Sequence, residues 1–119
     1  YPLGSRFHIP HGVSNSLMFS HVMKVNYSSN PEKFARIAAI LGEEIAGLPI
    51  EKAAERSVGA VERLCKDCGV PTQLSEVDVP AHVIPELAEA AFETQQRLLG
   101  FNPKKLTLED IERIYRAAA

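Results

Sequence analysis

The sequence contains little cysteine, no tryptophan and no long apolar run. Among its 119 residues are two cysteines, Cys65 and Cys68, which are too few for a disulfide framework and fit a reducing cytoplasm. The apolar runs are far shorter than the roughly 20 residues that cross a bilayer. No secretion leader opens the sequence. We therefore expect a cytoplasmic protein that has no membrane partner.

Neither sign of charge dominates the sequence. The 13 basic and 15 acidic residues are mixed along the chain and give a net charge of −2. Because no run of Lys or Arg offers a stripe for phosphates, nucleic acid is not an expected partner. The sequence also lacks G-x-G-x-x-G, a P-loop and a G-x-S-x-G elbow. These absences argue against a nucleotide-binding turn or a serine nucleophile within the chain.

The length is that of one ordinary domain with a single core. The first residue, Tyr1, is not a methionine, and the sequence opens abruptly within a stretch that reads as functional. We therefore expect the chain to be a fragment of a longer protein.

The first part of the sequence predicts a loop followed by a buried helix. Pro2, Gly4 and Pro10 argue against one continuous regular element, and we expect a turn or a strained loop there. A helix is predicted to begin near His11 and to end near Asn26. Apolar residues occur on almost every side of it, a pattern typical of a buried helix.

Three further helices are expected from spacing and from helix-end chemistry. The first begins with Asn30 as the cap and stops near Gly42. The second is closed by Gly69, and the third is predicted over residues 84–99. The inner face of the second is expected to consist of Ile50, Ala53, Ala54, Val58, Val61, Leu64 and Cys65. The inner face of the third is expected to consist of Leu87, Ala88, Ala91, Gln95 and Leu98.

The last helix has the clearest start signal. Thr107 is a predicted cap with Asp110 as its capping-box partner. No stretch of the sequence predicts a strand. The predicted fold class is therefore all-α, a helical bundle domain of five to six or more helices. The apolar stripe of the last helix is predicted to be Ile111, Ile114, Tyr115 and Ala118.

The segment His8-Ile9-Pro10-His11-Gly12 carries the most chemistry. Imidazole is the commonest protein ligand for divalent transition metals, and a histidine at the mouth of a buried helix has a rigid support. Two neighbouring histidines in a loop are nevertheless more often ordinary polar residues. On spacing alone, both interpretations stay open.

The other candidate ligands favour structural roles. Cys65 and Cys68 form a C-x-x-C near the end of a helix, with no second pair to complete a zinc site. We interpret Cys65 as a small buried apolar residue. His21 is expected to be a hydrogen-bonded structural histidine, and His82 an exposed loop residue.

The stretch YPLGSRFHIPHGVSNSLMFSHVMKVN at residues 1–26 resembles the hallmark segment of the iron-containing (group III) alcohol dehydrogenases. Three other segments also resemble that family, so the similarity covers essentially the whole chain. They are PEKFARIAAILG, GVPTQLSEVDVP and NPKKLTLEDIERIY. The resemblance implies the C-terminal helical, metal-binding domain of the dehydroquinate synthase-like fold over residues 1–119, without the N-terminal nucleotide-binding domain.

The resemblance also implies an activity and its site residues. In that family an aspartate and three histidines hold a divalent metal, iron or zinc, and the last of these histidines matches His11. Tyr1 matches a position near the nicotinamide and the substrate, which implies contact with the cofactor NAD or NADP. No catalytic residue is assigned, and the role of His8 stays open. The implied reaction oxidises a primary or secondary alcohol by hydride transfer, with the metal as Lewis acid.

Alternatives to this enzyme remain at this stage. A single histidine does not hold a catalytic metal, which needs about three protein ligands, so the fragment alone is expected to be inactive. It could instead serve as a non-catalytic helical interaction module. A glycerol dehydrogenase-like relative is the second enzyme hypothesis. For the intact protein we expect a small alcohol or aldehyde substrate, the nucleotide-binding half as a partner, and a homo-oligomer.

Overall fold

The chain consists of seven α-helices joined by loops and short 3-10 turns, and it has no strand. The computed structural model describes all of residues 1–119. The predicted all-α fold is therefore confirmed. None of the helices combines the length and the hydropathy that a membrane span requires. The helices are α1 Pro2–Phe7, α2 His11–Asn26, α3 Pro31–Ile40, α4 Ile50–Asp67, α5 Ile84–Thr94, α6 Gln96–Leu99 and α7 Leu108–Ala117.

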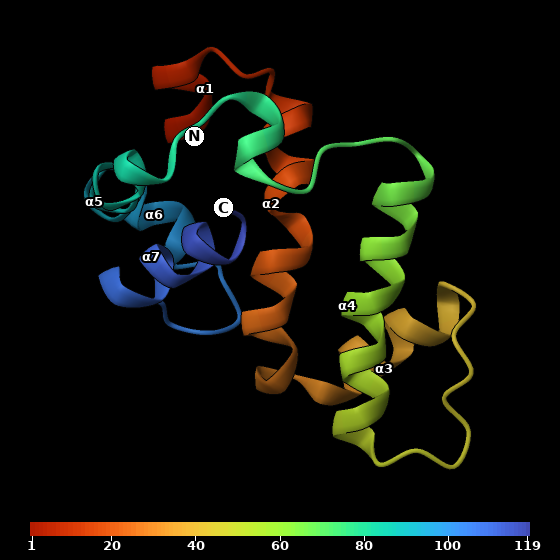
Figure 1. The fold of residues 1–119 in the computed structure, drawn as a ribbon. Helices are drawn as coiled ribbons and strands as arrows, with labels where there is room; N and C mark the ends of the chain where they lie inside the picture. Colours follow the sequence, from red (N-terminus) through yellow and green to blue (C-terminus); the bar gives the residue numbers. More distant parts are fainter.

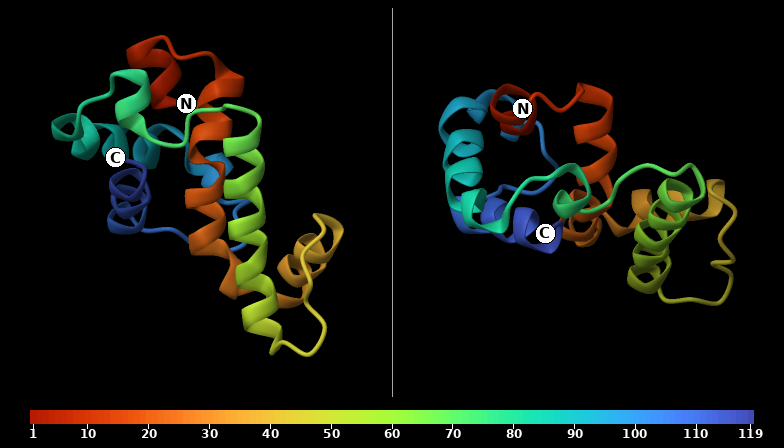
Figure 2. Two further views of the ribbon diagram at one scale, coloured as in Figure 1. Left: turned by 45° about the vertical axis from the view of Figure 1, so that its right-hand side comes forward. Right: turned by 45° about the horizontal axis from the view of Figure 1, so that its top comes forward.

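Helix α2 stands in the centre and has helices on two sides (Figure 1). The α1, α5, α6 and α7 helices gather on one side, and the α3–α4 hairpin lies on the other (Figures 1 and 2). The molecule is elongated, with principal extents of 44 × 30 × 20 Å. The long central helix thus links two packed units.

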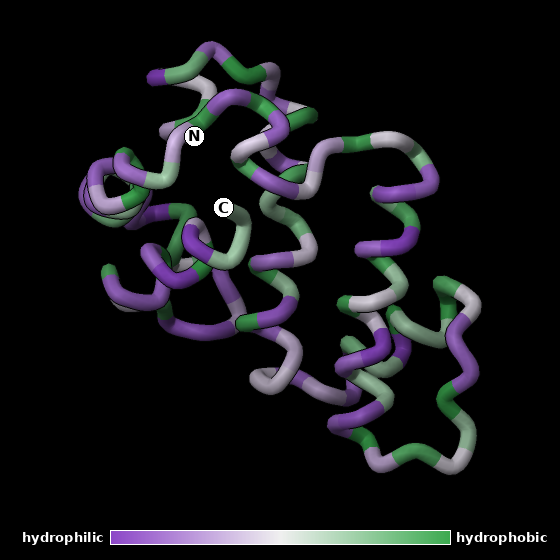
Figure 3. The backbone as a smooth tube through the Cα atoms, in the orientation of Figure 1, coloured by the Kyte–Doolittle hydropathy of each residue, from purple (hydrophilic) through white to green (hydrophobic).

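Each unit has its own apolar core. The larger core joins α1, α2, α5 and α7, and Leu17 and Leu87 are fully buried in it. The smaller core lies where the second half of α2 meets α3 and α4. Figure 3 shows hydrophobic and hydrophilic residues alternating along α4, as expected of a helix with one packed face. The smaller core consists of Met23, Phe34, Ala54, Val58, Val61 and Cys65.

Helix ends follow the predicted chemistry. Asn30 accepts a hydrogen bond from the backbone N–H of Lys33 at 3.3 Å. The capping box of α7 is complete, since Thr107 and Asp110 each accept a backbone hydrogen bond from the other. Hydrogen bonds from Thr107 hold the pKa of the Asp110 carboxyl below its usual value, because they stabilise the charged form.

Two predictions about helix boundaries were wrong. Residues 2–7 form α1 rather than a loop. Pro2 occupies the first turn of that helix, where a missing N–H costs no hydrogen bond. The helix predicted over residues 84–99 is divided at Gln95, whose φ of −116° and ψ of 28° interrupt the helical geometry.

Several side chains predicted to be buried are exposed. Leu64 and Leu98 are 51% and 44% exposed, and Ile50 is 48% exposed, so their assignment to inner faces was wrong. The predicted all-round burial of α2 was also wrong in part. Leu17 and Met23 are buried, whereas Phe19 is 51% exposed, because no element of the chain covers that side of α2.

A pair of asparagines ties the end of α2 to the loop before α7. The amide of Asn26 donates to Oδ1 of Asn102 at 2.7 Å, and the amide of Asn102 donates in return to Oδ1 of Asn26 at 2.9 Å. Asn26 is only 5% exposed. This reciprocal bond satisfies its polar atoms and fixes the far end of α2.

The burial of Tyr115 predicts a loss of stability in alkali. Burial raises the pKa of its phenol from 10 to about 12. A folded-state pKa above the unfolded value gives stability that is complete below pH 10 and is lost as the pH rises towards 12. This loss should reach roughly 2–3 kcal/mol. Urea unfolding at pH 9 and pH 11.5 should therefore show a steeper decline for the wild type than for Tyr115→Phe. Parallel declines would contradict the prediction.

Candidate functional site

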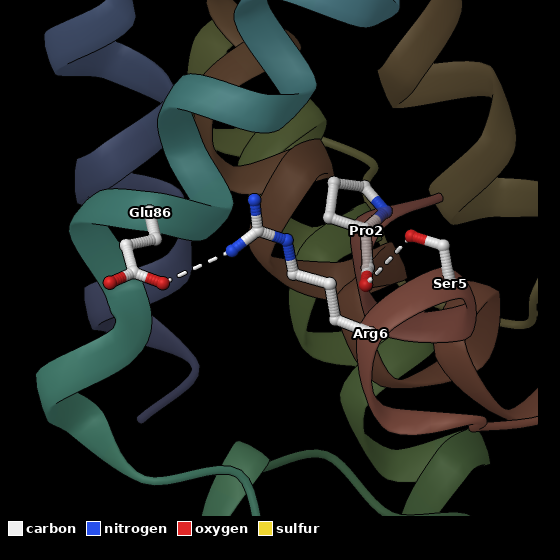
Figure 4. Close-up of polar contacts among 4 residues, drawn as sticks. All are labelled: Pro2, Ser5, Arg6 and Glu86. Atoms are coloured by element: carbon white, nitrogen blue, oxygen red, sulfur yellow. Dashed lines mark hydrogen bonds and ion pairs between the residues drawn. The ribbon is translucent and has the colours of Figure 1, made fainter.

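The two predicted site residues, Tyr1 and His11, lie before and after α1, and an ion pair joins α1 to α5. The guanidinium of Arg6 donates to the carboxylate of Glu86 at 3.1 Å, across the gap between the two helices (Figure 4). Within α1, the hydroxyl of Ser5 donates to the carbonyl of Pro2 at 3.3 Å (Figure 4). Both side chains of the ion pair are largely exposed, so it contributes to orientation more than to stability.

His8 ends α1 in the left-handed region, with φ of 55° and ψ of 29°. Its backbone N–H donates to the carbonyl of Gly4 and completes the last turn. The next residue, Ile9, is buried, and Pro10 then precedes the first turn of α2. The role of His8 evident in the structure is therefore to turn the backbone.

His11 is the first residue of α2, and its side chain is exposed. Its Nε2 atom lies 3.1 Å from the amide nitrogen of Asn15, one helical turn further on. Residues at this spacing are neighbours on a helix surface, so Asn15 is placed to hydrogen-bond the imidazole of His11. His11, the predicted metal ligand, thus lies exposed at the N-terminal end of α2.

Tyr1 lies beside His11. The two ring centroids are 5.8 Å apart, and the ring planes make an angle of 48°. Tyr1 is 65% exposed, so most of its ring faces outward from this chain. The structure therefore brings together both site residues that the sequence predicted. It leaves their roles as metal ligand and cofactor contact as predictions.

The residues of this chain do not form a complete metal site. No group of three or more His, Cys, Asp or Glu side chains is placed to hold a metal ion. The exposed imidazole of His11 fits a metal as one ligand. Catalytic zinc sites use about three protein ligands. His11 therefore fits a metal only as part of a shared ligand set.

The remaining histidines have the surroundings expected of them. His21 is half-buried, and its Nε2 donates to the backbone carbonyl of Thr72 at 2.7 Å. The interpretation of His21 as a hydrogen-bonded structural residue is confirmed. His82 is exposed, as predicted.

The two cysteines differ in burial and in reactivity. Cys65 is buried and Cys68 is exposed. Burial raises the pKa of the Cys65 thiol, and the neighbouring Cys68 adds to the shift. A raised pKa lowers the thiolate fraction, so Cys65 is a poor nucleophile. The prediction that Cys65 is a small buried apolar residue is confirmed.

Asn15 is the site residue that sequence reasoning missed. It was not assigned a role, although it lies four residues after His11 in a predicted helix. Residues at this spacing are neighbours on a helix surface. The signal was therefore present in the spacing. Asn15 and Phe19 also line an open groove of about 840 Å³ between α2, α3 and α4, and Leu41 and Leu64 form part of its apolar wall.

Comparison with known proteins identifies the chain by its sequence. Residues 1–119 match the family described as Fe-containing alcohol dehydrogenase family, C-terminal. The chain belongs to the iron-containing alcohol dehydrogenase family. The match covers every element described above, including the segment that holds Tyr1, His11 and Asn15.

The relatives agree with this assignment. The chain is 39% identical over 118 residues to the lactaldehyde reductase of Escherichia coli K12, and 38% identical over 118 residues to the 1,3-propanediol dehydrogenase of Klebsiella pneumoniae. Each alignment covers 99% of this chain and 30% of the relative. The chain thus spans less than a third of the length of these curated relatives.

A solved structure gives the same result for the fold. The chain superposes on a 1,3-propanediol oxidoreductase with a TM-score of 0.90 and 38% sequence identity. The superposition covers 99% of this chain and 30% of the oxidoreductase. The arrangement of helices is therefore that of the C-terminal helical region of an iron-containing alcohol dehydrogenase.

Proposed function

We propose that this chain is the ligand-donating helical part of a metal- and NAD(P)-dependent alcohol dehydrogenase. The enzyme oxidises a primary or secondary alcohol to an aldehyde or a ketone, and acts on small substrates. The observation that carries the proposal is the position of His11, exposed at the first turn of α2 beside Tyr1. Such a place at the end of a rigid helix suits a ligand shared with another part of a protein.

His11 supplies one imidazole to the metal, and the other ligands lie in the polypeptide that accompanies this chain. A bound divalent metal would supply Lewis-acid catalysis at the substrate oxygen. The nicotinamide cofactor would accept a hydride from the carbinol carbon. Tyr1 forms a wall beside His11, and its exposed ring is available to contact the cofactor or the substrate.

The alternative function is a helical interaction module without chemistry. The observation in its favour is that this chain brings together no three metal-ligating side chains. The two proposals differ in the activity expected when the chain is joined to the rest of such an enzyme. The dehydrogenase proposal expects metal-dependent activity, and the interaction module expects none. A glycerol dehydrogenase-like enzyme remains the second candidate within the enzyme class, and the homo-oligomer and cytoplasmic location remain predictions.

A chimera tests the proposed function. Residues 1–119 would replace the matching 118 residues of the Escherichia coli lactaldehyde reductase, to which they are 39% identical. We expect the chimera to reduce lactaldehyde, to lose activity on chelation of its metal and to regain it with Fe²⁺ or Zn²⁺. Parallel assays with NADH, NADPH and glycerol would distinguish the cofactors and the glycerol dehydrogenase-like reading.

The 119-residue chain alone provides the matched control. It should neither reduce lactaldehyde nor bind Fe²⁺ or Zn²⁺ tightly, because it presents a single ligand. A chimera that has a native circular dichroism spectrum but no metal-dependent activity would favour the interaction module. Tight stoichiometric binding by the chain alone would show that the shared ligand set is wrong.

A further inference from the structure

The open groove of about 840 Å³ between α2, α3 and α4 carries no charge. Buried residues of the smaller core line it, and its rim includes Phe19 of α2 and Leu64 of α4, each 51% exposed. No Asp, Glu, Lys, Arg or His side chain is among its lining residues. Large exposed apolar surfaces of this kind mark sites of interaction.

One face of α2 is uncovered along this groove, from the first turn of the helix onward. Gly12, Asn15 and Phe19 are exposed, and their spacing of three and four residues places them on the same face. A Cβ atom at Gly12 would meet no atom within 4 Å. The backbone of α2 is therefore open to close approach by another element at this end.

The position of Tyr1 relates the groove to the rest of an intact enzyme. The matching family model is described as C-terminal, and the chain covers 30% of the two relatives named above, so most of such a relative lies before the matched region. In an intact enzyme of this kind the preceding polypeptide joins the chain at Tyr1, which lies beside His11 in the first turn of α2. The groove begins one turn further along, at Asn15. The preceding polypeptide therefore meets the groove at the N-terminal end of α2.

We propose that the groove binds the segment that directly precedes residue 1 in the intact protein, folded as an apolar α-helix antiparallel to α2. A segment that lies in the groove and ends at the N-terminal end of α2 must run in the opposite direction to α2. A helix satisfies its own backbone N–H and C=O groups, which an apolar wall cannot do. The inference rests on the proposed function only in requiring that the chain be part of a longer enzyme.

The length of the groove sets the length of the segment. Its lining residues on α2 extend from Asn15 to Asn26. At a rise of 1.5 Å per residue this stretch is about 17 Å long, so a helix of about 12 residues covers it. Such a helix needs apolar side chains on one face, at the three- and four-residue spacing of an amphipathic helix.

Cysteine labelling compares the groove in the free 119-residue chain and in the lactaldehyde reductase chimera. Phe19→Cys and Leu64→Cys each place a thiol on one wall of the groove. The matched control is Ile40→Cys, at a side chain that is 76% exposed and outside the groove. Alkylation followed by peptide mass spectrometry gives the reaction rate of each thiol.

We expect the thiols at positions 19 and 64 to react about tenfold more slowly or less in the chimera, because a covered side chain reacts only when its contact opens. The thiol at position 40 and the native, exposed Cys68 should react equally fast in both proteins. Equal rates at positions 19 and 64 in the chain and the chimera would overturn the proposal. Protection that appears only in the free chain, as its concentration rises, would assign the groove to a second copy and overturn it as well.

A charge placed in the groove gives an independent measurement. Phe19→Glu should leave the urea midpoint of the free chain nearly unchanged, since residue 19 is half exposed there. The same variant should lower the midpoint of the chimera, where the carboxylate would be buried without a partner. Ile40→Glu should leave both midpoints unchanged. An unchanged midpoint in the Phe19→Glu chimera would contradict the proposal.

The labelling result and the metal-dependent activity of the chimera can fail separately. Protected thiols in a chimera that has no metal-dependent activity would support the groove and contradict the dehydrogenase proposal. Metal-dependent activity in a chimera whose thiols at positions 19 and 64 stay fully reactive would contradict only the groove.

Discussion

Replacement of His11 by alanine in the chimera is expected to lower kcat/KM for lactaldehyde by about 100-fold or more. Lewis-acid stabilisation of a transition state is worth several kcal/mol, and each 1.4 kcal/mol or so corresponds to a factor of ten in rate. Removal of one ligand from a shared set should weaken or abolish metal binding. Steady-state kinetics with saturating Fe²⁺ would measure the loss.

The matched control for this variant is His8→Asn. His8 lies three residues before His11, is exposed, and has a positive φ that asparagine tolerates better than most residues. Its kcat/KM should stay within about threefold of the parent, a change of roughly 0.7 kcal/mol. Full activity in the His11→Ala chimera would contradict the role of His11. Equal losses in both variants would indicate damage to the loop rather than to a ligand.

Replacement of Leu17 by alanine should have the largest effect on stability. Leu17 is fully buried in the larger core, on the part of α2 that packs near α1 and α7. Removal of a buried leucine side chain loses its transfer free energy and leaves a cavity, which together cost about 2–5 kcal/mol. This cost is a large share of the roughly 5–15 kcal/mol by which a domain is stable. Urea unfolding of the 119-residue chain would measure it.

Leu98→Ala removes the same atoms from an exposed site. Leu98 is 44% exposed on α6, and its replacement should change the free energy of unfolding by less than about 1 kcal/mol. Equal effects of the two substitutions would contradict the burial pattern. Because periodicity alone placed Leu98 inside, this pair also tests the structure against the sequence prediction.

The helices of this fold could be predicted mainly where their ends carry strong signals. The caps at Asn30 and Thr107 and the apolar stripe of α7 led to correct boundaries. Pro2, by contrast, argues against a regular element at the sequence level, although proline also suits the first turn of a helix. The break at Gln95 was missed because a change in φ and ψ at one residue leaves the apolar spacing on either side intact.

Burial could be predicted less well than helicity. Periodicity gives the apolar face of a helix, but it does not give the width of surface that neighbouring helices cover. Leu64 and Phe19 therefore lie at the margins of α4 and α2, where the chain has no further element to pack on them. The exposure of these two side chains depends on how the helices pack against one another. The spacing of apolar residues within one helix carries no information about that packing.

The candidate site shows a similar division. The P-H-G context singled out His11 through resemblance to a family, while spacing alone favoured ordinary polar residues over a metal site. Tyr1 and His11 are separated by α1 and by a left-handed turn at His8, and the sequence patterns predicted a turn in this stretch without its position or the helix before it. Asn15 could have been found from its spacing, but only after His11 had been singled out as a candidate site residue.

The metal content of the purified chimera tests the central claim most directly. Elemental analysis after reconstitution with Fe²⁺ or Zn²⁺ should find about one metal ion per chain in the parent chimera and in His8→Asn, since one shared ligand set holds one ion. The His11→Ala chimera should contain a small fraction of that amount. One metal ion per chain in His11→Ala, bound as tightly as in the parent, would contradict the account.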